Sequence, residues 1–373
     1  MAGIIIIGGG FAGLAALKKL ARSGLGLNIT LIDKKVQSDF LPELPDVIGR
    51  LISPEFLSYD IRDLAKKIKF DFINEQVLGV DLVKQEVSTL TQKRNYDYLI
   101  IASGSETNFY GQEDVKRYAY KLDSVDDAKK ITDAVKVKDF DYFIISGGGY
   151  TGVEVATNLR LYLNKRKSNK AVIIVERAPS LLGPLPQALK DYAALNLGKL
   201  GVRVVLKTTI SKVEGDKVTL STGETFARSM LIWAAGVRTD DFIQRLNLEK
   251  NPQGRLKVDE YLRVNERCFV AGDAANFSHQ GNPLRMAVQF SILEGRLAAS
   301  NIINRIKGLH LKRYKPIDLG YIVPMANNRS CGIVMGIYVS GLPATFLHFA
   351  MCIYRSMSFK NGVGIIKDLI FKK

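Results

Sequence analysis

The stretch that decides the fold is GIIIIGGGFAGLAALKKL, residues 3–20. Its run of isoleucines is typical of a short parallel strand that is buried on both faces. The pattern Gly8-x-Gly10-x-x-Gly13 follows at once and leads into a helical pattern. Such glycines permit a tight turn, a close approach of the backbone to a pyrophosphate, and close packing of the helix on the strand. The stretch therefore predicts a strand–turn–helix unit that binds a dinucleotide.

An acidic residue completes this first unit. The next strand, NITLID, ends in Asp33, about 20 residues beyond the last glycine of the turn. A carboxylate at that place can accept hydrogen bonds from both ribose hydroxyls of a nucleotide. The helix N-terminus after the turn offers free N–H groups and the positive end of a dipole to the phosphates.

The same device occurs a second time, in YFIISGGGYTGVEVA, residues 142–156. Its glycines are Gly147, Gly149 and Gly152, and the following strand, AVIIVE, ends in Glu176. One such glycine motif is a weak signal, because turns often contain glycine. Two copies, each between a strand and a helix and each followed by a strand-end acid, predict two nucleotide sites. Glu176 favours NADH, because its carboxylate would repel the 2′-phosphate of NADPH.

Composition narrows the classes of partner. The formal net charge of +16 favours an anionic lipid surface, nucleic acid or an acidic partner. No recognition helix or aromatic platform supports nucleic acid, so none is expected as a partner. The cysteines Cys268, Cys331 and Cys352 are far apart and form no CxxC, and the histidines are scattered. We therefore expect neither a disulfide framework nor a metal site.

Three more strands end in small residues and glycine, at 98–105 (YLIIASGS), 230–237 (MLIWAAGV) and 268–276 (CFVAGDAAN). In this order the motifs resemble those of the two-dinucleotide-binding-domain flavoproteins of the glutathione-reductase type. The resemblance implies an α/β fold with two Rossmann-like domains, in which the first site holds the ADP half of FAD and the second holds NADH. It also implies that Asp273 hydrogen-bonds the ribityl chain of FAD.

This resemblance gives expected cofactor residues and domain bounds. The residues expected to bind FAD are Gly8, Gly10, Phe11, Ala12, Gly13, Asp33, Lys34, Val77, Ala102, Ser103, Gly104, Gly272, Asp273, Ala287 and Val288. Those expected to bind NADH are Gly147, Gly149, Tyr150, Thr151, Gly152, Glu176, Ala235 and Gly236. The FAD-binding domain is expected at 1–110 and 254–325, the NADH-binding domain at 111–253, and a C-terminal membrane-attachment segment at 326–373.

Within these flavoproteins the chain resembles the type II NADH dehydrogenases, which pass electrons from NADH through FAD to a membrane quinone. Glu154 follows the second glycine motif where this family has a glutamate, and LRMAVQ, 284–289, resembles its quinone-site motif. The resemblance implies catalytic roles for Glu154 and Gln289 and quinone contacts for Gln289 and Arg285. Arg285 stands where the family has a glutamine.

Other functions stay open at this point. Disulfide reductases and sulfide:quinone oxidoreductases need cysteines near the flavin, and the chain has none before Cys268. A sulfide:quinone oxidoreductase-like enzyme, another FAD-dependent pyridine nucleotide oxidoreductase and a signalling protein like the apoptosis-inducing-factor flavoproteins remain as alternatives.

The end of the chain is unusually apolar. A helix is expected from Ala344 to Met357, with a break over 358–364 and a second helical segment after it. Thr345, His348, Cys352 and Arg355 form one narrow polar stripe on the first helix, and most of its other residues are apolar. Apolar faces with nearby lysines are typical of helices that lie in a membrane interface. We expect a peripheral protein on the cytoplasmic face of the cell membrane; packing on the protein's own core or in a homodimer is the alternative.

Overall fold

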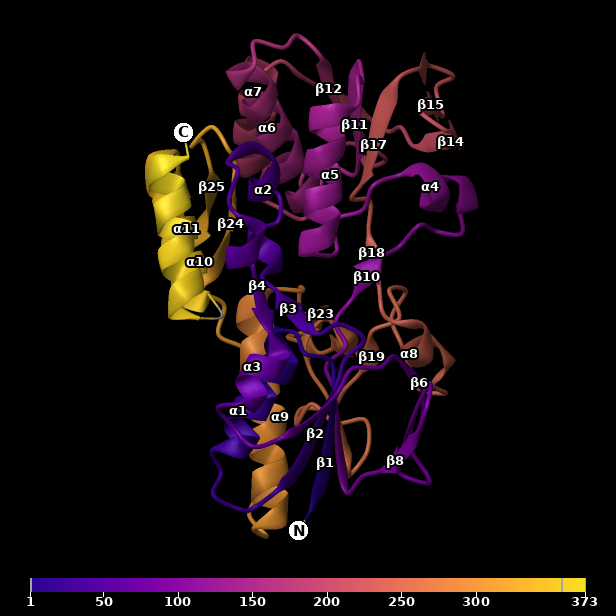
Figure 1. The fold of residues 1–373 in the computed structure, drawn as a ribbon, viewed down its shortest axis with the longest axis vertical. Helices are drawn as coiled ribbons and strands as arrows, with labels where there is room; N and C mark the ends of the chain where they lie inside the picture. Colours follow the sequence, from indigo (N-terminus) through magenta and orange to yellow (C-terminus); the bar gives the residue numbers. More distant parts are fainter. Residues whose placement is uncertain (1, 357, 373) are drawn as a thin grey trace. The chain divides into compact units, whose positions relative to one another are not determined.

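The computed structural model describes residues 2–356 and 358–372. The chain forms two compact units, and each combines helices with a parallel sheet (Figure 1). The first unit comprises residues 1–38, 60–106 and 237–318, and the second comprises 39–59, 107–236 and 319–373. The chain passes between the units at the short strands β3 (Gln37–Asp39), β4 (Ser58–Asp60), β10 (Glu106–Thr107) and β18 (Val237–Arg238), and again after Asp318.

The first unit contains a five-stranded parallel sheet in the order β20-β9-β1-β2-β5. Its strands are β1 (Gly3–Ile7), β2 (Asn28–Ile32), β5 (Asp71–Ile73), β9 (Tyr98–Ile101) and β20 (Cys268–Val270). The isoleucines of β1 are almost fully buried, as expected for a central strand with both faces covered. Strand order reverses beside β1, between β2 and β9, which is where open α/β sheets bind ligands.

Two helices of the first unit carry residues of the expected site. Helices α1 (Phe11–Ala21) and α9 (Val288–Ile306) lie side by side (Figure 1). Gly295 makes this possible, because a Cβ there would lie 2.1 Å from the carbonyl oxygen of Ala12. The remaining elements are α3 (Ile61–Ala65), α8 (Asp241–Arg245), the 3-10 helix η3 (Gly272–Ala274), the antiparallel sheet β6 (Val77–Asp81), β7 (Glu86–Thr89) and β8 (Lys93–Asn95), and the pairs β19 (Leu256–Lys257) with β21 (Ala275–Asn276) and β22 (Ser278–His279) with β23 (Asn282–Pro283).

The second unit is built around a four-stranded parallel sheet in the order β13-β12-β11-β17. Its strands are β11 (Tyr142–Ser146), β12 (Ala171–Glu176), β13 (Val202–Leu206) and β17 (Ser229–Trp233). An antiparallel sheet of β14 (Ile210–Glu214), β15 (Lys217–Leu220) and β16 (Thr225–Phe226) accompanies it. The helices are α4 (Glu113–Tyr118), α5 (Val125–Val137), α6 (Tyr150–Lys165) and α7 (Gln187–Lys199).

The second unit also includes the end of the chain. Strands β24 (Gly320–Val323), β25 (Cys331–Val334) and β26 (Ile337–Ser340) form an antiparallel sheet, followed by α10 (Leu342–Arg355) and α11 (Phe359–Phe371). The short helices η1 (Leu41–Glu43), α2 (Asp46–Gly49) and η2 (Pro54–Phe56) belong to the same unit. The structure thus groups the expected C-terminal segment, 326–373, with the second nucleotide-binding sheet; the expected domain bounds themselves stay a prediction.

The expected break over 358–364 is wrong, because α11 already begins at Phe359. The hydroxyl oxygen of Ser358 accepts a hydrogen bond from the Asn361 backbone N–H and so caps the helix start. Gly364, within the expected break, instead permits close packing, since a Cβ there would lie 2.4 Å from the ring of Phe56. The expected first helix reached Met357, which lies outside the described residues. Among the described helices, none has the length and apolar character needed to cross a bilayer.

Candidate functional site

The first glycine turn has the geometry of a phosphate cradle. Gly8 has a φ of +103°, and a Cβ there would lie 2.3 Å from the carbonyl oxygen of Ala102, so this turn and the end of β9 touch. A Cβ at Gly13 would lie 1.8 Å from the Gly8 carbonyl oxygen. A Cβ at Gly10, in contrast, would meet no atom within 4 Å. Two glycines are therefore required by packing, and Gly10 leaves open space at the N-terminus of α1.

No side chain caps the start of α1, for which Gly10 is the N-cap. The first N–H groups of a helix have no partner within the helix, and they attract anions together with the helix dipole. The combination of open space and uncapped N–H groups fits the pyrophosphate of a dinucleotide.

Asp33 directly follows β2 and contacts the first glycine turn. Its Oδ2 accepts a hydrogen bond from the Gly9 N–H at 2.5 Å, and its Oδ1 accepts one from the Lys35 N–H at 2.7 Å. Burial raises the pKa of this carboxyl, and the two backbone hydrogen bonds oppose that effect. Asp33 also lines a pocket together with Gly8, Lys34, Val77 and Ser103. The pocket thus brings together five of the residues expected to bind FAD.

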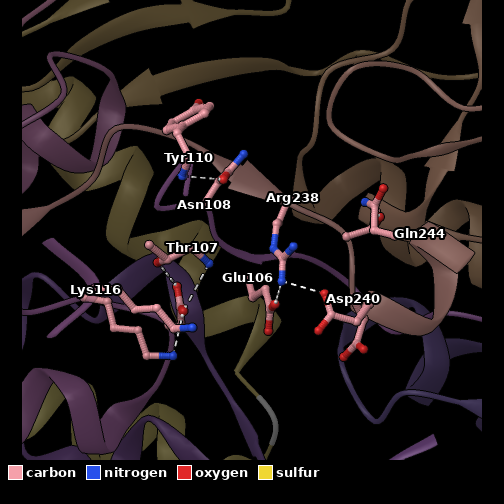
Figure 2. Close-up of polar contacts among 12 residues, drawn as sticks. Glu106, Thr107, Asn108, Tyr110, Lys116, Arg238, Asp240 and Gln244 are labelled. Atoms are coloured by element: carbon pink, nitrogen blue, oxygen red, sulfur yellow. Dashed lines mark hydrogen bonds and ion pairs between the residues drawn. The ribbon is translucent and has the colours of Figure 1, made fainter. Parts of the chain in front are cut away.

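Lys34 is part of a charged network at the edge of this pocket. Its Nζ lies 3.1 Å from Asp240 and 3.5 Å from Glu106. Glu106 in turn pairs with Arg238 at 3.2 Å (Figure 2), and Arg238 also pairs with Asp241 at 2.6 Å. Sequence reasoning did not find Glu106, Arg238 or Asp240, because they follow no motif and meet Lys34 only through the fold.

The turn after β20 forms the other side of the first site. The Oδ2 of Asp273 accepts a hydrogen bond from the Ser105 hydroxyl at 2.8 Å, and burial raises the pKa of the Asp273 carboxyl. Arg255 donates to the backbone carbonyls of Asp273 and Ala275 and so fixes this turn. The structure therefore brings the expected FAD residue Asp273 to Ser105, beside the expected residues Ser103 and Gly104.

Glu294 supports the same turn from α9. It is 2% exposed, and its Oε2 accepts a hydrogen bond from the Gly272 N–H at 2.7 Å. Burial raises the pKa of Glu294 to about 8. Sequence reasoning missed Glu294. Its position within the first two turns of α9, the helix that follows the glycine–aspartate turn, could have indicated that it contacts this turn.

The second glycine turn has nearly the same backbone geometry and contacts as the first. Gly147 has a φ of +107°, and a Cβ there would lie 2.5 Å from the Ala234 carbonyl oxygen. Glu176 takes the place of Asp33: its Oε2 accepts a hydrogen bond from the Gly148 N–H at 2.5 Å, and its Oε1 accepts one from Ala178 N–H at 2.6 Å. The N-cap of α6, Gly149, is again open and has no side-chain cap. The second unit therefore has an open glycine turn of the same geometry as the first.

Other expected NADH residues lie around this second turn. Gly152 packs against the turn, since a Cβ there would lie 1.9 Å from the Gly147 carbonyl oxygen. Tyr150 and Thr151 begin α6, and Ala235 and Gly236 follow β17. The Tyr110 hydroxyl donates to the carbonyl oxygen of Ala235 at 3.2 Å. Together these residues gather at the carboxyl ends of β11 and β17, where strand order reverses.

The two expected quinone residues share one acidic partner in the first unit. Arg285 forms a two-pronged ion pair with Asp318, and the side-chain amide of Gln289 donates to Asp318 Oδ1 at 3.1 Å. Gln289 lies in the first turn of α9 and is 8% exposed. Asp318 was not predicted, because it follows a loop and no sequence pattern links it to the motif at 284–289.

Glu154 lies on α6 in the second unit, within a group of acidic residues. Burial raises the pKa of Glu154 well above its ordinary value, and Asp46 and Glu43 add to the effect. Asp46 pairs with Arg50 at 3.1 Å, and burial also raises its pKa, to about 7. Glu43 and Asp46 come from η1 and α2, far from Glu154 in sequence, so the motif alone did not predict them.

Two curated relatives match nearly the whole of this chain. A curated type II NADH:quinone oxidoreductase of Staphylococcus haemolyticus is 28% identical over 99% of this chain and 98% of its own length. The enzyme of the same name from Staphylococcus aureus is 26% identical over 92% of both chains.

Solved structures share the fold. NDH2 from Plasmodium falciparum, in complex with NADH, has a TM-score of 0.87 at 19% identity and covers 99% of this chain and 97% of its own. The sulfide:quinone oxidoreductase of Aquifex aeolicus has a TM-score of 0.80 at 20% identity, covering 100% of this chain and 96% of its own. The family model of pyridine nucleotide-disulphide oxidoreductases matches residues 2–295. The chain belongs to the pyridine nucleotide-disulphide oxidoreductase family.

Proposed function

We propose that this chain is a type II NADH:quinone oxidoreductase that binds FAD in its first unit and NADH in its second. The observation that carries the proposal is the duplicated cradle, with Asp33 on Gly9 in one unit and Glu176 on Gly148 in the other. The staphylococcal relatives, which match over nearly their whole lengths, carry that name.

The first unit fits FAD. The uncapped start of α1 at Gly10 would take the pyrophosphate, Asp33 would take the adenosine ribose, and Asp273, held by Ser105, would take the ribityl chain. The chemistry that FAD would supply there is acceptance of a hydride from NADH and transfer of two electrons to a quinone. The start of α9 at Ala287 and Val288 would direct the positive end of its dipole at the flavin ring.

The second unit fits NADH. Gly149 and the first turn of α6 would take its pyrophosphate, and Glu176 would take the ribose of its adenosine half. Glu154 would position the nicotinamide or hold a proton there. Its raised pKa supports the second role, because the carboxyl keeps a proton at a pH where an exposed glutamate has lost it.

Gln289 and Arg285 are the proposed quinone contacts. Both carry N–H donors, which are the groups that a quinone carbonyl accepts hydrogen bonds from. Asp318 binds both side chains and so fixes the direction in which they lie. Asp318 would thus act as a positioning residue for the quinone site.

We also propose that α10 and α11 attach the enzyme to the membrane that contains the quinone. On α11, Phe359, Val363, Ile366 and Ile370 are each at least 40% exposed, and their spacing places them on one stripe. On α10, Leu342, Phe346 and Tyr354 are exposed, whereas the expected polar stripe faces inward, with Thr345 and Cys352 buried. These apolar residues face outward, whereas an ordinary surface helix turns its apolar face towards the protein core.

The other face of α11 is fixed to the protein. Asp368 accepts a hydrogen bond from the Ser53 N–H at 2.7 Å, and the Asn361 side-chain amide donates to the Ser58 carbonyl oxygen at 3.0 Å. The exposed lysines Lys360 and Lys367 flank the apolar stripe. Exposed apolar groups with adjacent lysines suit the boundary between acyl chains and anionic headgroups. The cytoplasmic face of the cell membrane is the proposed location, because NADH is supplied there.

Anaerobic stopped-flow spectroscopy tests the reaction. The purified FAD-loaded protein is mixed first with NADH and then with a short-chain quinone, and the flavin absorbance is followed. We expect bleaching within seconds and prompt recovery on quinone. Bleaching without recovery would move the acceptor elsewhere and favour a soluble acceptor or a signalling role. Bleaching by sulfide but not by NADH would favour a sulfide:quinone oxidoreductase, although Cys268 and Cys331 are both fully buried.

A further inference from the structure

Three side chains with metal-binding chemistry meet inside the second unit. His348 and Cys352 lie one helical turn apart on α10, and Glu43 reaches them from η1. Glu43 is 0% exposed, Cys352 is 6% exposed, and the His348 side chain is 11% exposed. None of the three contacts a substrate or cofactor in the reaction proposed above.

Their spacing is that of ligands around one small cation. His348 Nε2 lies 3.3 Å from Glu43 Oε1 and 3.8 Å from Cys352 Sγ, and the three ligand atoms lie within 4.8 Å of one another. Tetrahedral zinc, with bonds of about 2.0 Å to nitrogen and oxygen and about 2.3 Å to sulfur, holds nitrogen and oxygen about 3.3 Å apart and nitrogen and sulfur about 3.6 Å apart. The two distances from His348 Nε2 lie within a few tenths of an ångström of these values.

Glu43 supplies an independent reason to expect a cation. Neither oxygen of its buried carboxylate accepts a hydrogen bond of good geometry among the described residues, and its polar neighbours are the imidazole of His348 and the thiol of Cys352. A buried carboxylate that accepts no hydrogen bond is costly, so native proteins pair such a group or coordinate it to a metal. The nearby Arg50 does not do this, because its guanidinium pairs with Asp46 and donates to Asn328.

Two further acidic residues, Asp46 and Glu154, lie close enough to Glu43 to be influenced by its charge. A divalent cation between Glu43, His348 and Cys352 would offset the charge of the Glu43 carboxylate. Thiolate and imidazole ligands select zinc over magnesium and calcium, which prefer oxygen ligands throughout.

We propose that Glu43, His348 and Cys352 bind one Zn²⁺ ion. Three protein ligands leave the fourth tetrahedral position for a water molecule or another small ligand. The ion would tie α10, which carries part of the apolar surface, to η1 near the start of the chain. Its main effect would therefore be to stabilise the position of the C-terminal helices in the second unit.

Cobalt substitution tests the site directly. The FAD-loaded full chain, without a histidine tag, is stripped with a chelator, dialysed and titrated with Co²⁺. We expect one Co²⁺ per chain and tetrahedral d–d bands at wavelengths longer than those that oxidised flavin absorbs. Elemental analysis after incubation with Zn²⁺ and dialysis should give one zinc per chain. The measurements need neither NADH nor quinone, so their result is independent of the proposed reaction.

Matched variants assign the ligands. Cys352→Ser and His348→Gln should each abolish the d–d bands, whereas Cys331→Ser, which changes another buried cysteine of the same unit, should leave them intact. The exposed histidines provide a second control, since the double variant His279→Gln/His310→Gln should bind Co²⁺ like the parent.

Thermal unfolding tests metal binding without relying on the absorption bands of Co²⁺. Zn²⁺ should raise the melting temperature of the parent by about 4 °C or more, and this shift should vanish in Cys352→Ser or His348→Gln, whichever variant folds. A stoichiometry well below one metal per chain overturns the proposal. Bands or a thermal shift that survive the loss of both Cys352 and His348 overturn it equally.

Discussion

The Oδ2 atom of Asp33 accepts a hydrogen bond from the backbone N–H of Gly9 at 2.5 Å. This contact ties the acid at the end of β2 to the glycine turn after β1, so the proposed ribose and phosphate contacts lie next to each other. Glu176 and Gly148 repeat the relationship at the same distance in the second unit. An aspartate and a longer glutamate thus reach the same backbone position in two separate sheets.

Replacing two glycines of the first turn by alanine should have different effects: Gly13→Ala should impair folding, whereas Gly10→Ala should impair flavin binding. Gly13→Ala places a Cβ 1.8 Å from the Gly8 carbonyl oxygen, so the turn must shift, at a cost of roughly 1–3 kcal/mol or more of folding free energy. Gly10→Ala meets no atom and should fold normally, but its methyl group would occupy the space for the pyrophosphate. Flavin content and melting temperature separate the two effects. A Gly10→Ala protein with full flavin content would contradict the assigned cradle.

Glu176 should determine the preference for NADH. Replacing it by glutamine keeps an acceptor for the Gly148 N–H and removes the negative charge that opposes a 2′-phosphate. We expect the ratio of kcat/KM for NADPH to that for NADH to rise about tenfold, which corresponds to about 1.4 kcal/mol. Steady-state kinetics measures this ratio. Flavin content is the control and should stay unchanged, because Glu176 lies in the second cradle.

Asp318 should affect the reaction with quinone and not the reduction of the flavin by NADH. In Asp318→Asn, Arg285 and Gln289 lose the carboxylate that holds them both, and because the ion pair is partly exposed we expect a rise in quinone KM of about threefold to tenfold. The rate of flavin bleaching by NADH in stopped-flow experiments should not change. Asp259→Asn is the matched control, since it removes another aspartate that pairs with an arginine, Arg263, in the same unit. An equal slowing of both half-reactions would argue against a positioning role.

Sequence reasoning predicted the two glycine turns and their acids because each set is local: strand, turn, helix and acid follow one another within a short stretch of the chain. It did not predict the partners that the cradles and the quinone residues acquire from elsewhere, such as Ser105 for Asp273 and Asp318 for Gln289. It also placed a break at 358–364, where the structure has the start of α11. Gly364 packs directly on Phe56 there, a tertiary contact that the local sequence does not indicate.

Glu294 should make stability depend on pH. Its pKa is raised to about 8 in the folded protein, from about 4.5 for an ordinary glutamate, so the folded state binds more protons than the unfolded state between these values. The contribution of Glu294 to the free energy of unfolding is therefore fully present below about pH 4.5. It is lost as the pH rises towards 8, at no more than about 1.4 kcal/mol per pH unit.

Thermal unfolding of the FAD-loaded protein at pH 5, 6, 7 and 8 checks this dependence. Glu294→Gln cannot ionise, so its melting temperature should fall less over this range than that of the parent. The exposed Glu113→Gln is the control and should follow the parent curve. Parallel curves for Glu294→Gln and the parent would show that Glu294 titrates normally.

The outward apolar stripe of α11 should be needed for membrane binding. Phe359 is 89% exposed and Ile370 is 55% exposed, and burying such side chains in a bilayer contributes about 1.5–3 kcal/mol each. The double variant Phe359→Ser/Ile370→Ser should therefore sediment poorly with phosphatidylglycerol vesicles that bind the parent. Leu195→Ser, which removes an apolar side chain that is 61% exposed on α7, should bind like the parent. If vesicle binding is unchanged and analytical ultracentrifugation instead shows that the double variant dissociates a dimer, the stripe is a protein interface and the proposed attachment is wrong.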